Sequence, residues 1–137
     1  MKTIAVDFDG TIVEHAYPAI GKERPFAVAT LKRLQEEGNL LILWTSRTGD
    51  LLDEAVAWCR ERGLVFWAVN AECPDEDPEH PLRRKLVADY YIDDRNLGGL
   101  PDWGVIYALV NGETRPVYDY VMPPVKKTGW LKNLLGR

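Results

Sequence analysis

Three short apolar runs, each followed by reactive polar residues, constrain the fold of this chain most. The runs and the residues that follow them are 3–6 with Asp7, 40–44 with Thr45, and 88–92, which Asp89 interrupts, with Asp93-Asp94. Continuous apolar runs of this length are typical of strands in a parallel sheet that is covered on both faces. The carboxyl ends of parallel strands meet at one edge, where α/β folds bind their ligands. The sequence therefore predicts an α/β fold with its reactive residues gathered at that edge.

Two segments between these runs have the apolar spacing of amphipathic helices. The first follows Pro25 and ends near Gly38, and the second has Thr48 as its expected N-cap and ends before Gly63. In both segments apolar residues recur every three to four positions, which is the period of a helix. Strands that alternate with helices predict a mainly parallel, doubly wound sheet.

Further strands are expected at residues 64–69 and 104–110, which makes a sheet of about five strands. Asn111-Gly112 follows the second of these and precedes a run at residues 114–121. A two-residue Asn-Gly connection is a strong signal for a tight hairpin, so we expect a C-terminal β-hairpin.

The chain is expected to be a single catalytic domain over residues 1–125, followed by a tail. In that tail, residues 126–137, apolar side chains fall on one helical face with basic flanks. Burial against the same domain or a dimer partner is the preferred interpretation, with a membrane surface as the alternative.

Composition narrows the class of protein. The 137 residues are 46% hydrophobic and 28% charged, with a net charge of −4. This balance suits an ordinary globular domain and gives no general attraction to nucleic acid or to an anionic membrane. No secretory or membrane-spanning run is present, and Cys59 and Cys73 have no metal or disulfide spacing. We therefore expect a cytoplasmic protein with reduced thiols.

Asp7 and Asp9 leave the first strand into a turn that contains Gly10. Two carboxylates at this spacing can converge on one pocket, and magnesium prefers oxygen ligands of this kind. A carboxylate can also act as a nucleophile and form an aspartyl-phosphate. The motif alone leaves open the alternative that both residues only cap a turn.

Four motifs in order resemble those of the haloacid dehalogenase-like (HAD) phosphatase superfamily. They are Asp7-Phe8-Asp9-Gly10-Thr11, Leu41-Ile42-Leu43-Trp44-Thr45, Lys85, and Tyr91-Ile92-Asp93-Asp94. The resemblance covers roughly residues 1 to 110 and implies a HAD-like Rossmannoid fold. The intervals between the motifs are too short for an inserted cap domain, so the chain is similar to small, capless, mostly bacterial HAD proteins that are uncharacterised.

The resemblance implies a magnesium-dependent phosphohydrolase that cleaves a phosphate monoester. Asp7 would be the nucleophile and Asp9 the general acid and base. Thr45 would donate its hydroxyl to a phosphoryl oxygen, and Lys85 would neutralise charge on the phosphate and on Asp7. Phosphoryl transfer depends mainly on such fixed donors and cations.

The metal ligands that the resemblance implies are the carboxylates of Asp7, Asp93 and Asp94 and the backbone carbonyl of Asp9. Relatives with an acidic pair favour Asp94 over Asp93 as the direct ligand. Adjacent buried anions also repel one another unless a cation is bound. We therefore expect Mg²⁺ as the cofactor.

Substrate contacts are expected from residues around the same edge: Gly10, Thr11, Ser46, Arg47 and Asn70. A guanidinium at Arg47 could clamp a phosphate, with a salt bridge at the helix start as the alternative. A turn-forming role is the preferred alternative for Asn70. His15 and His80 lack metal-ligand spacing and are interpreted as surface-loop residues.

A capless pocket is open, which suits a phosphorylated small molecule or the phosphorylated end of a macromolecule. Residues 12–24, interpreted as a flap, or the partner in a homodimer would have to close it. Asp93-Asp94-Arg95 also resembles the phosphatase half of polynucleotide kinase-phosphatases, so a 3′ polynucleotide-end phosphatase is the alternative enzyme. The acidic composition disfavours nucleic acid. A non-catalytic HAD-fold module that binds phosphate or a partner is the alternative outside enzymes.

Overall fold

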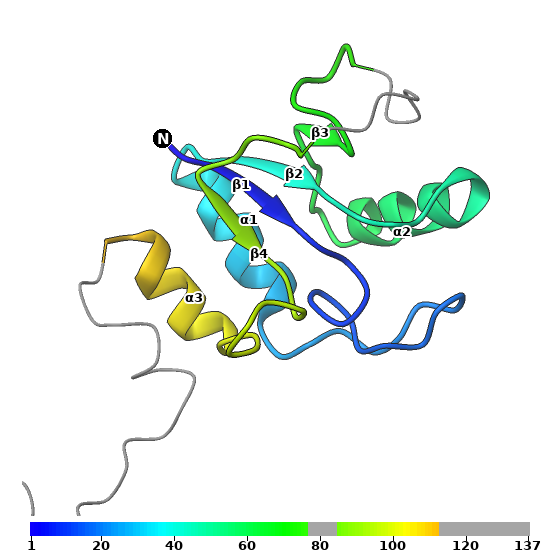
Figure 1. Ribbon diagram of the computed structural model, residues 1–137, viewed down its shortest axis with the longest axis horizontal. Helices are drawn as coiled ribbons and strands as arrows, with labels where there is room; N and C mark the ends of the chain where they lie inside the picture. The colour runs from blue at the N-terminus through cyan, green and yellow to red at the C-terminus, as the bar shows by residue number, and fades with distance from the viewer. Residues whose placement is uncertain (77–84, 113–137) are drawn as a thin grey trace, which may run out of the picture.

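The computed structural model describes residues 1–76 and 85–112. Figure 1 shows an α/β arrangement in which strands and helices alternate along most of the chain. The elements are β1 (Thr3–Val6), α1 (Ala27–Glu36), β2 (Leu40–Leu43), α2 (Gly49–Glu61), β3 (Ala68–Val69), β4 (Tyr90–Ile92) and α3 (Trp103–Val110). No helix within these two ranges is long and apolar enough to cross a membrane.

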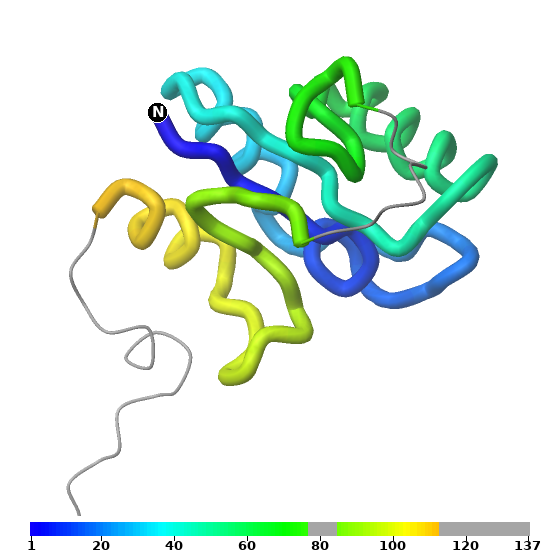
Figure 2. The backbone as a smooth tube through the Cα atoms, turned by 45° about the horizontal axis from the view of Figure 1, so that its top comes forward, coloured from blue at the N-terminus to red at the C-terminus, as the bar shows by residue number. Residues whose placement is uncertain are grey.

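The described strands form one parallel sheet in the order β3-β2-β1-β4. β1 lies in the middle, between β2 and β4, as the tube in Figure 2 also shows. Backbone hydrogen bonds continue past the strand ends, from Asp7 N to the Ile92 carbonyl at 2.9 Å and from Trp44 N to the Val6 carbonyl at 2.8 Å. The residues after β1, β2 and β4 are therefore fixed side by side, and the α/β fold with a parallel sheet is confirmed.

The two faces of the sheet are covered differently. Ile4 and Val6 of β1 belong to a large core cluster that includes buried residues of all three helices. Ala5, between them, faces the other way and belongs to a smaller cluster with Ile42 and with Leu86 from the β3–β4 connection. A doubly wound sheet has helices on both faces, and the described helices share one cluster. The described parts of the β3–β4 connection contain no helix, and residues 77–84 of it lie outside the described residues, so helices on both faces stay a prediction.

Both expected helices between the first strands are present. α1 buries Leu31 and Leu34, and the chain leaves it through Gly38, whose φ of 93° suits glycine. Thr48 is the N-cap of α2, although its side chain accepts no capping hydrogen bond. The third strand is shorter than expected, because only residues 68–69 pair with β2 at the edge of the sheet.

The expected fifth strand at residues 104–110 is wrong, because this segment forms α3. Asp102 is its N-cap and accepts a 3.0 Å hydrogen bond from Val105 N. Trp103, Ile106 and Val110 are buried at spacings of three and four, the helical period. Abundant β-branched residues favoured a strand, but the cap and the burial of one helical stripe decide the outcome.

The C-terminal hairpin is also corrected, since its first arm is helical. Asn111 is the C-cap of α3, and Gly112, with φ of 88°, follows it instead of turning a hairpin. The second arm at residues 114–121 and the tail at 126–137 lie outside the described residues. The domain boundary at residue 125 stays a prediction for the same reason.

Candidate metal centre

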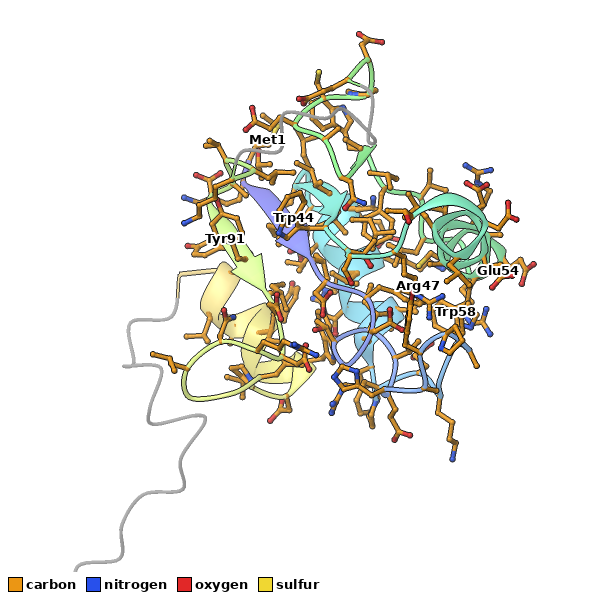
Figure 3. All side chains as sticks on the ribbon, turned by 45° about the vertical axis from the view of Figure 1, so that its right-hand side comes forward. Met1, Trp44, Arg47, Glu54, Trp58 and Tyr91 are labelled. Atoms are coloured by element: carbon orange, nitrogen blue, oxygen red, sulfur yellow. The ribbon has the colours of Figure 1, made fainter. Side chains whose placement is uncertain are left out.

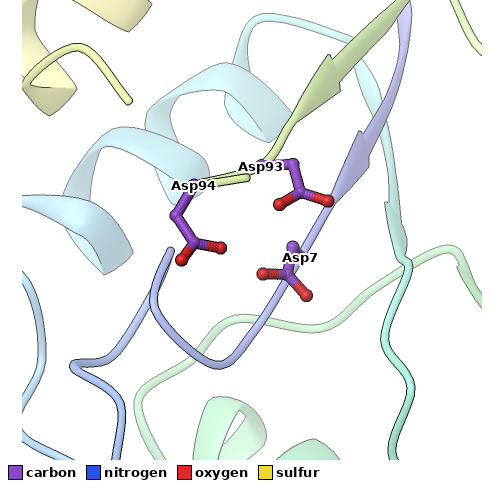
Figure 4. A group of neighbouring side chains, drawn as sticks. All are labelled: Asp7, Asp93 and Asp94. Atoms are coloured by element: carbon purple, nitrogen blue, oxygen red, sulfur yellow. The ribbon is translucent and has the colours of Figure 1, made fainter. Parts of the chain in front are cut away.

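Three carboxylates meet at the carboxyl ends of β1 and β4. One oxygen each from Asp7, Asp93 and Asp94 lies within 4.8 Å of the other two. Figure 4 shows the three side chains pointing toward a common centre between the two strand ends. All three residues are partly buried. The parallel register of β1 and β4 places them together, as the sequence predicted.

The surroundings of Asp7 and Asp94 shift the pKa values of these two acids in opposite directions. Burial, followed by the negative charge of Asp93 and the hydrogen bond with Asp94, raises the pKa of Asp7 to about 7, although the Thr11 hydroxyl lowers it. Burial also works to raise the pKa of Asp94, but hydrogen bonds, first with His15 and then with Asp7, hold it below its usual range. Without a cation, the pKa of Asp7 is therefore higher than that of Asp94.

The Thr11 hydroxyl lies between two of the acids. Its Oγ1 is 3.0 Å from Asp7 Oδ2 and 3.3 Å from Asp94 Oδ1, and it accepts a 3.0 Å hydrogen bond from Asp94 N. Thr11 is fully buried. We expected Thr11 to contact substrate. In the structure its hydroxyl instead links the residues that follow β1 and β4.

His15 also reaches the acidic group, which the surface-loop interpretation missed. Its Nε2 lies 2.8 Å from Asp94 Oδ2, and its side chain is about half exposed. Gly10 makes room for this contact: a Cβ there would lie 2.2 Å from His15 Nε2 and 2.4 Å from Asp94 Oδ2. Gly10 thus shapes the site through its missing side chain. No spacing rule in the sequence connects a histidine at position 15 with an aspartate at position 94.

Asp9 does not belong to the group of three acids and is paired with Arg47. The guanidinium grips both carboxylate oxygens, with Nε 2.7 Å from Oδ2 and Nη2 2.8 Å from Oδ1. Between Asp7 and Asp9, Phe8 is fully buried and packs edge-on against Trp58 of α2. Anchoring of Phe8 in the core sends the two neighbouring carboxylates to different surroundings.

Arg47 itself has no exposed surface. Its remaining N–H groups donate to the carbonyls of Pro18, Ala19 and Leu51, so all five guanidinium donors are used. Figure 3 shows Arg47 in the interior beside α2. The expected contact with substrate is therefore corrected, and the alternative of a salt bridge at the helix start is the one observed.

The flap at residues 12–24 is part of the fixed structure around the site. Val13 bridges Glu23, and Arg24 N donates to the Ile12 carbonyl at 2.8 Å. The Arg24 Nε also donates to the Gly10 carbonyl at 2.8 Å. Arg47 also donates hydrogen bonds to the carbonyls of residues 18 and 19. The flap is therefore held beside the site by hydrogen bonds at several points.

The loop after β2 carries the other expected substrate contacts. Thr45 is buried, and its hydroxyl accepts a 3.2 Å hydrogen bond from Arg47 N. Asn70, with φ of 50°, accepts a 2.8 Å bond from Thr45 N through its side chain. Asn70 thus supports the Thr45 loop from the end of β3, as its turn-forming alternative implied. Ser46 is exposed between two buried residues.

Lys85 is not brought to the acids within the described residues. It is exposed, and its ammonium lies 5.1 Å from the centre of the Tyr91 ring, a cation–π geometry. Over residues 1–76 and 85–112, no lysine or arginine forms an ion pair with Asp7, Asp93 or Asp94. Its expected role beside the phosphate stays a prediction.

The donor set fits a hard divalent cation. Three carboxylates supply oxygen ligands, and Mg²⁺ needs only one or two of them because it keeps several waters. The raised pKa of Asp7, caused first by burial and then by the charge of Asp93, indicates that its ionised form lacks compensation at this site. The site residues therefore fit Mg²⁺ on charge and on ligand chemistry.

No family model and no curated protein matches the chain. A solved structure, described as that of a conserved protein from Bacteroides thetaiotaomicron, is 55% identical over 88% of this chain and 97% of that one. The TM-score between the two folds is 0.78. Because identity at this level extends over most of both chains, this chain belongs to the same family as the conserved Bacteroides thetaiotaomicron protein.

Proposed function

We propose that the chain is a magnesium-dependent phosphohydrolase of the HAD type that cleaves a phosphate monoester through an aspartyl-phosphate on Asp7. The convergence of the Asp7, Asp93 and Asp94 carboxylates carries this proposal. Three acids this close repel one another, and no described lysine or arginine pairs with them. A bound cation would compensate that charge, and the phosphoryl group of a substrate would bind to the same cation.

In the proposed reaction an Asp7 oxygen attacks phosphorus, and the bond from phosphorus to the ester oxygen breaks. Protonated Asp9 gives its proton to the departing oxygen, so an alcohol leaves. Water then attacks the aspartyl-phosphate, Asp9 takes a proton from that water, and the bond between phosphorus and Asp7 breaks to release inorganic phosphate. Mg²⁺, when bound, neutralises charge on the phosphoryl oxygens and on the carboxylates.

The pairing of Asp9 with Arg47 sets a condition on this reaction. Both Asp9 oxygens accept hydrogen bonds from the buried guanidinium, and the Asp9 side chain is only 13% exposed. Asp9 must leave this pair before it can exchange a proton at the substrate. Catalysis on this scheme therefore includes a rearrangement of the Asp9 side chain when substrate binds.

The same pair favours a second candidate function, a HAD-fold module that binds a metal or phosphate without turnover. In that case Asp9 serves only to hold Arg47, and Lys85 stays against Tyr91. The two candidates share the acidic group and differ in whether Asp9 reaches a leaving group. The substrate class proposed for the enzyme is a phosphorylated small molecule or a macromolecule end, since the intervals between the motifs leave no room for a cap domain.

Hydrolysis of p-nitrophenyl phosphate with and without Mg²⁺ tests the proposal. We expect turnover with Mg²⁺ that is lost in EDTA and in Asp7→Asn. Full activity in a thoroughly chelated sample would contradict the mechanism. Metal binding without any turnover of phosphate esters would support the non-catalytic module. Beryllium fluoride, which mimics an acyl-phosphate, should add to Asp7, and its attachment elsewhere would refute the nucleophile.

A further inference from the structure

We propose that His15 is a positioning residue that holds Asp94 in the orientation needed to bind the metal. The proposal rests on the metal site of the proposed function and adds a residue from the flap to it. His15 Nε2 lies 2.8 Å from Asp94 Oδ2, and this distance is that of a charge-assisted hydrogen bond. The imidazole belongs to the loop after β1, and the carboxylate to the end of β4, so the contact joins two segments far apart in the sequence.

His15 acts from outside the metal group. The group in which every ligand atom lies within 4.8 Å of the others contains Asp7, Asp93 and Asp94, and it does not include His15. The imidazole contacts Asp94 without being as close to all three acids as these acids are to one another. Carboxylates that bind metals are commonly oriented by such outer hydrogen bonds.

Thr11 also lies within hydrogen-bonding distance of Asp94, and it has only one hydroxyl hydrogen. That hydroxyl lies 3.0 Å from Asp7 Oδ2 and 3.3 Å from Asp94 Oδ1. Because one hydrogen serves two carboxylates and Asp7 is nearer, Asp94 lacks a donor of its own from Thr11. His15 supplies one, to the other Asp94 oxygen.

The local fold is built around this contact. Gly10 has φ of 85°, and a Cβ there would overlap both His15 Nε2 and Asp94 Oδ2. The flap does not need His15 to stay in place, because Arg47 holds the carbonyls of Pro18 and Ala19. Loss of the imidazole should therefore change Asp94 while leaving the fold intact.

The test is calorimetric titration of Mg²⁺ into metal-free protein, without substrate. We expect His15→Ala to weaken Mg²⁺ binding by about 10- to 100-fold. His15→Gln should recover part of that loss, because its amide can still donate to Asp94. Lys22→Ala is the matched control: it removes a full positive charge from an exposed position in the same flap, and Mg²⁺ binding should stay unchanged.

The outcomes separate this proposal from the proposed function. Wild-type protein that binds Mg²⁺ and a His15→Ala variant that binds it equally well would overturn the positioning role and leave the metal site standing. Wild-type protein that binds no Mg²⁺ would overturn both. An equal loss in Lys22→Ala would show a general effect of charge and would also overturn the role of His15. Melting of wild-type and His15→Ala in EDTA should coincide, and a lower melting temperature of the variant would mean that His15 supports the fold instead.

Discussion

Asp7 and Asp9 stand two residues apart in one loop, yet their surroundings are opposite. Asp9 is gripped through both oxygens by a buried arginine whose five donors are all used. Asp7 faces two further carboxylates, and burial, with the neighbouring acids adding to it, raises its pKa to about 7. The buried Phe8 between them separates a compensated acid from an uncompensated one.

The comparison shows which of the two carboxylates is neutralised by a cationic side chain of the protein and which is not. Asp9 is paired with a guanidinium, which stays charged at any pH the protein meets. Asp7 has no lysine or arginine partner among the described residues, as the proposed metal site requires. Substitutions at Asp7 should therefore affect chemistry, and substitutions at Arg47 should affect stability.

The largest effect is expected from Asp7→Asn. The amide is a poor nucleophile, so turnover of p-nitrophenyl phosphate should fall by at least roughly 1,000-fold. Circular dichroism and melting of the variant should show an intact fold. The matched variant is Asp53→Asn, at an exposed position on α2, which should keep full activity. Retention of more than a tenth of the wild-type rate in Asp7→Asn would remove Asp7 from the chemistry.

Arg47→Ala should be the most damaging change to stability. It leaves the largely buried Asp9 carboxylate without its partner and removes donors from three backbone carbonyls. Breaking a buried pair from one side costs about 3–5 kcal/mol. Urea unfolding measures the loss, and Arg33→Ala in α1, where the arginine is exposed, is the control. A loss below about 1 kcal/mol would contradict a structural role for Arg47.

A double-mutant cycle sharpens this result. Asp9→Asn removes the charge that Arg47 compensates, so Arg47→Ala should cost less in that background than in the wild type. The coupling free energy from urea unfolding of the four proteins measures the pair itself. Additive effects would mean that Arg47 stabilises the fold through the carbonyls alone.

A smaller effect is expected from pH on the metal-free protein. Asp7 has a folded pKa of about 7, above its usual 3.8, so the folded state holds the proton more tightly than the unfolded state. The stability that this proton provides is fully present below about pH 4 and is lost as pH rises to about 7. The contribution is on the order of 1–3 kcal/mol, because the site is only partly buried.

Melting in EDTA between pH 5 and pH 8 measures this contribution. The wild type should lose stability relative to Asp7→Asn as pH rises, and Asp7→Asn should be the more stable protein at pH 8. Addition of Mg²⁺ should remove the difference, because the cation replaces the proton. A difference in melting temperature between the two proteins that stays constant at all pH values would contradict the raised pKa of Asp7.

The smallest effect is expected from Ser46→Ala, one residue before Arg47. Ser46 is exposed, so the free energy of unfolding should change by less than about 0.5 kcal/mol. If its hydroxyl contacts the phosphate, kcat/KM should fall roughly two- to tenfold. A change in stability as large as that of Arg47→Ala would show that the loop after β2 acts as one unit. Unchanged kcat/KM would remove Ser46 from the substrate site.

The strand ends of this protein could be predicted, because an apolar run that stops at an acid is a local pattern. The meeting of Asp7 with Asp93 and Asp94 followed from the rule that parallel strands share one carboxyl edge. α3 was missed because its apolar and β-branched residues resemble a strand, and the Asp102 cap was not recognised in the sequence. Residue type and spacing, which are local, were enough for the three strands that carry the acidic group and the Thr45 loop, but not for the fifth strand.

The partners of Arg47 and His15 were beyond such patterns. Arg47 looks like a phosphate clamp in sequence, and only packing shows that its donors reach Asp9 and the flap carbonyls. His15 meets Asp94 because the turn at Gly10 bends the chain back, which depends on tertiary structure. Contacts between distant segments carry no periodic signal in a single sequence.

The buried guanidinium of Arg47 also has a consequence for how this family can diverge. One side chain holds an aspartate, two flap carbonyls and the first turn of α2. A substitution of Arg47 would remove hydrogen bonds from three segments at once. It should therefore be tolerated only together with compensating substitutions in all three segments. Exposed flap side chains such as that of Lys22 are not constrained by burial in this way. Diversification of the recognition surface should therefore concentrate on those positions, and the arginine at 47 should persist among homologues whose flap sequences differ.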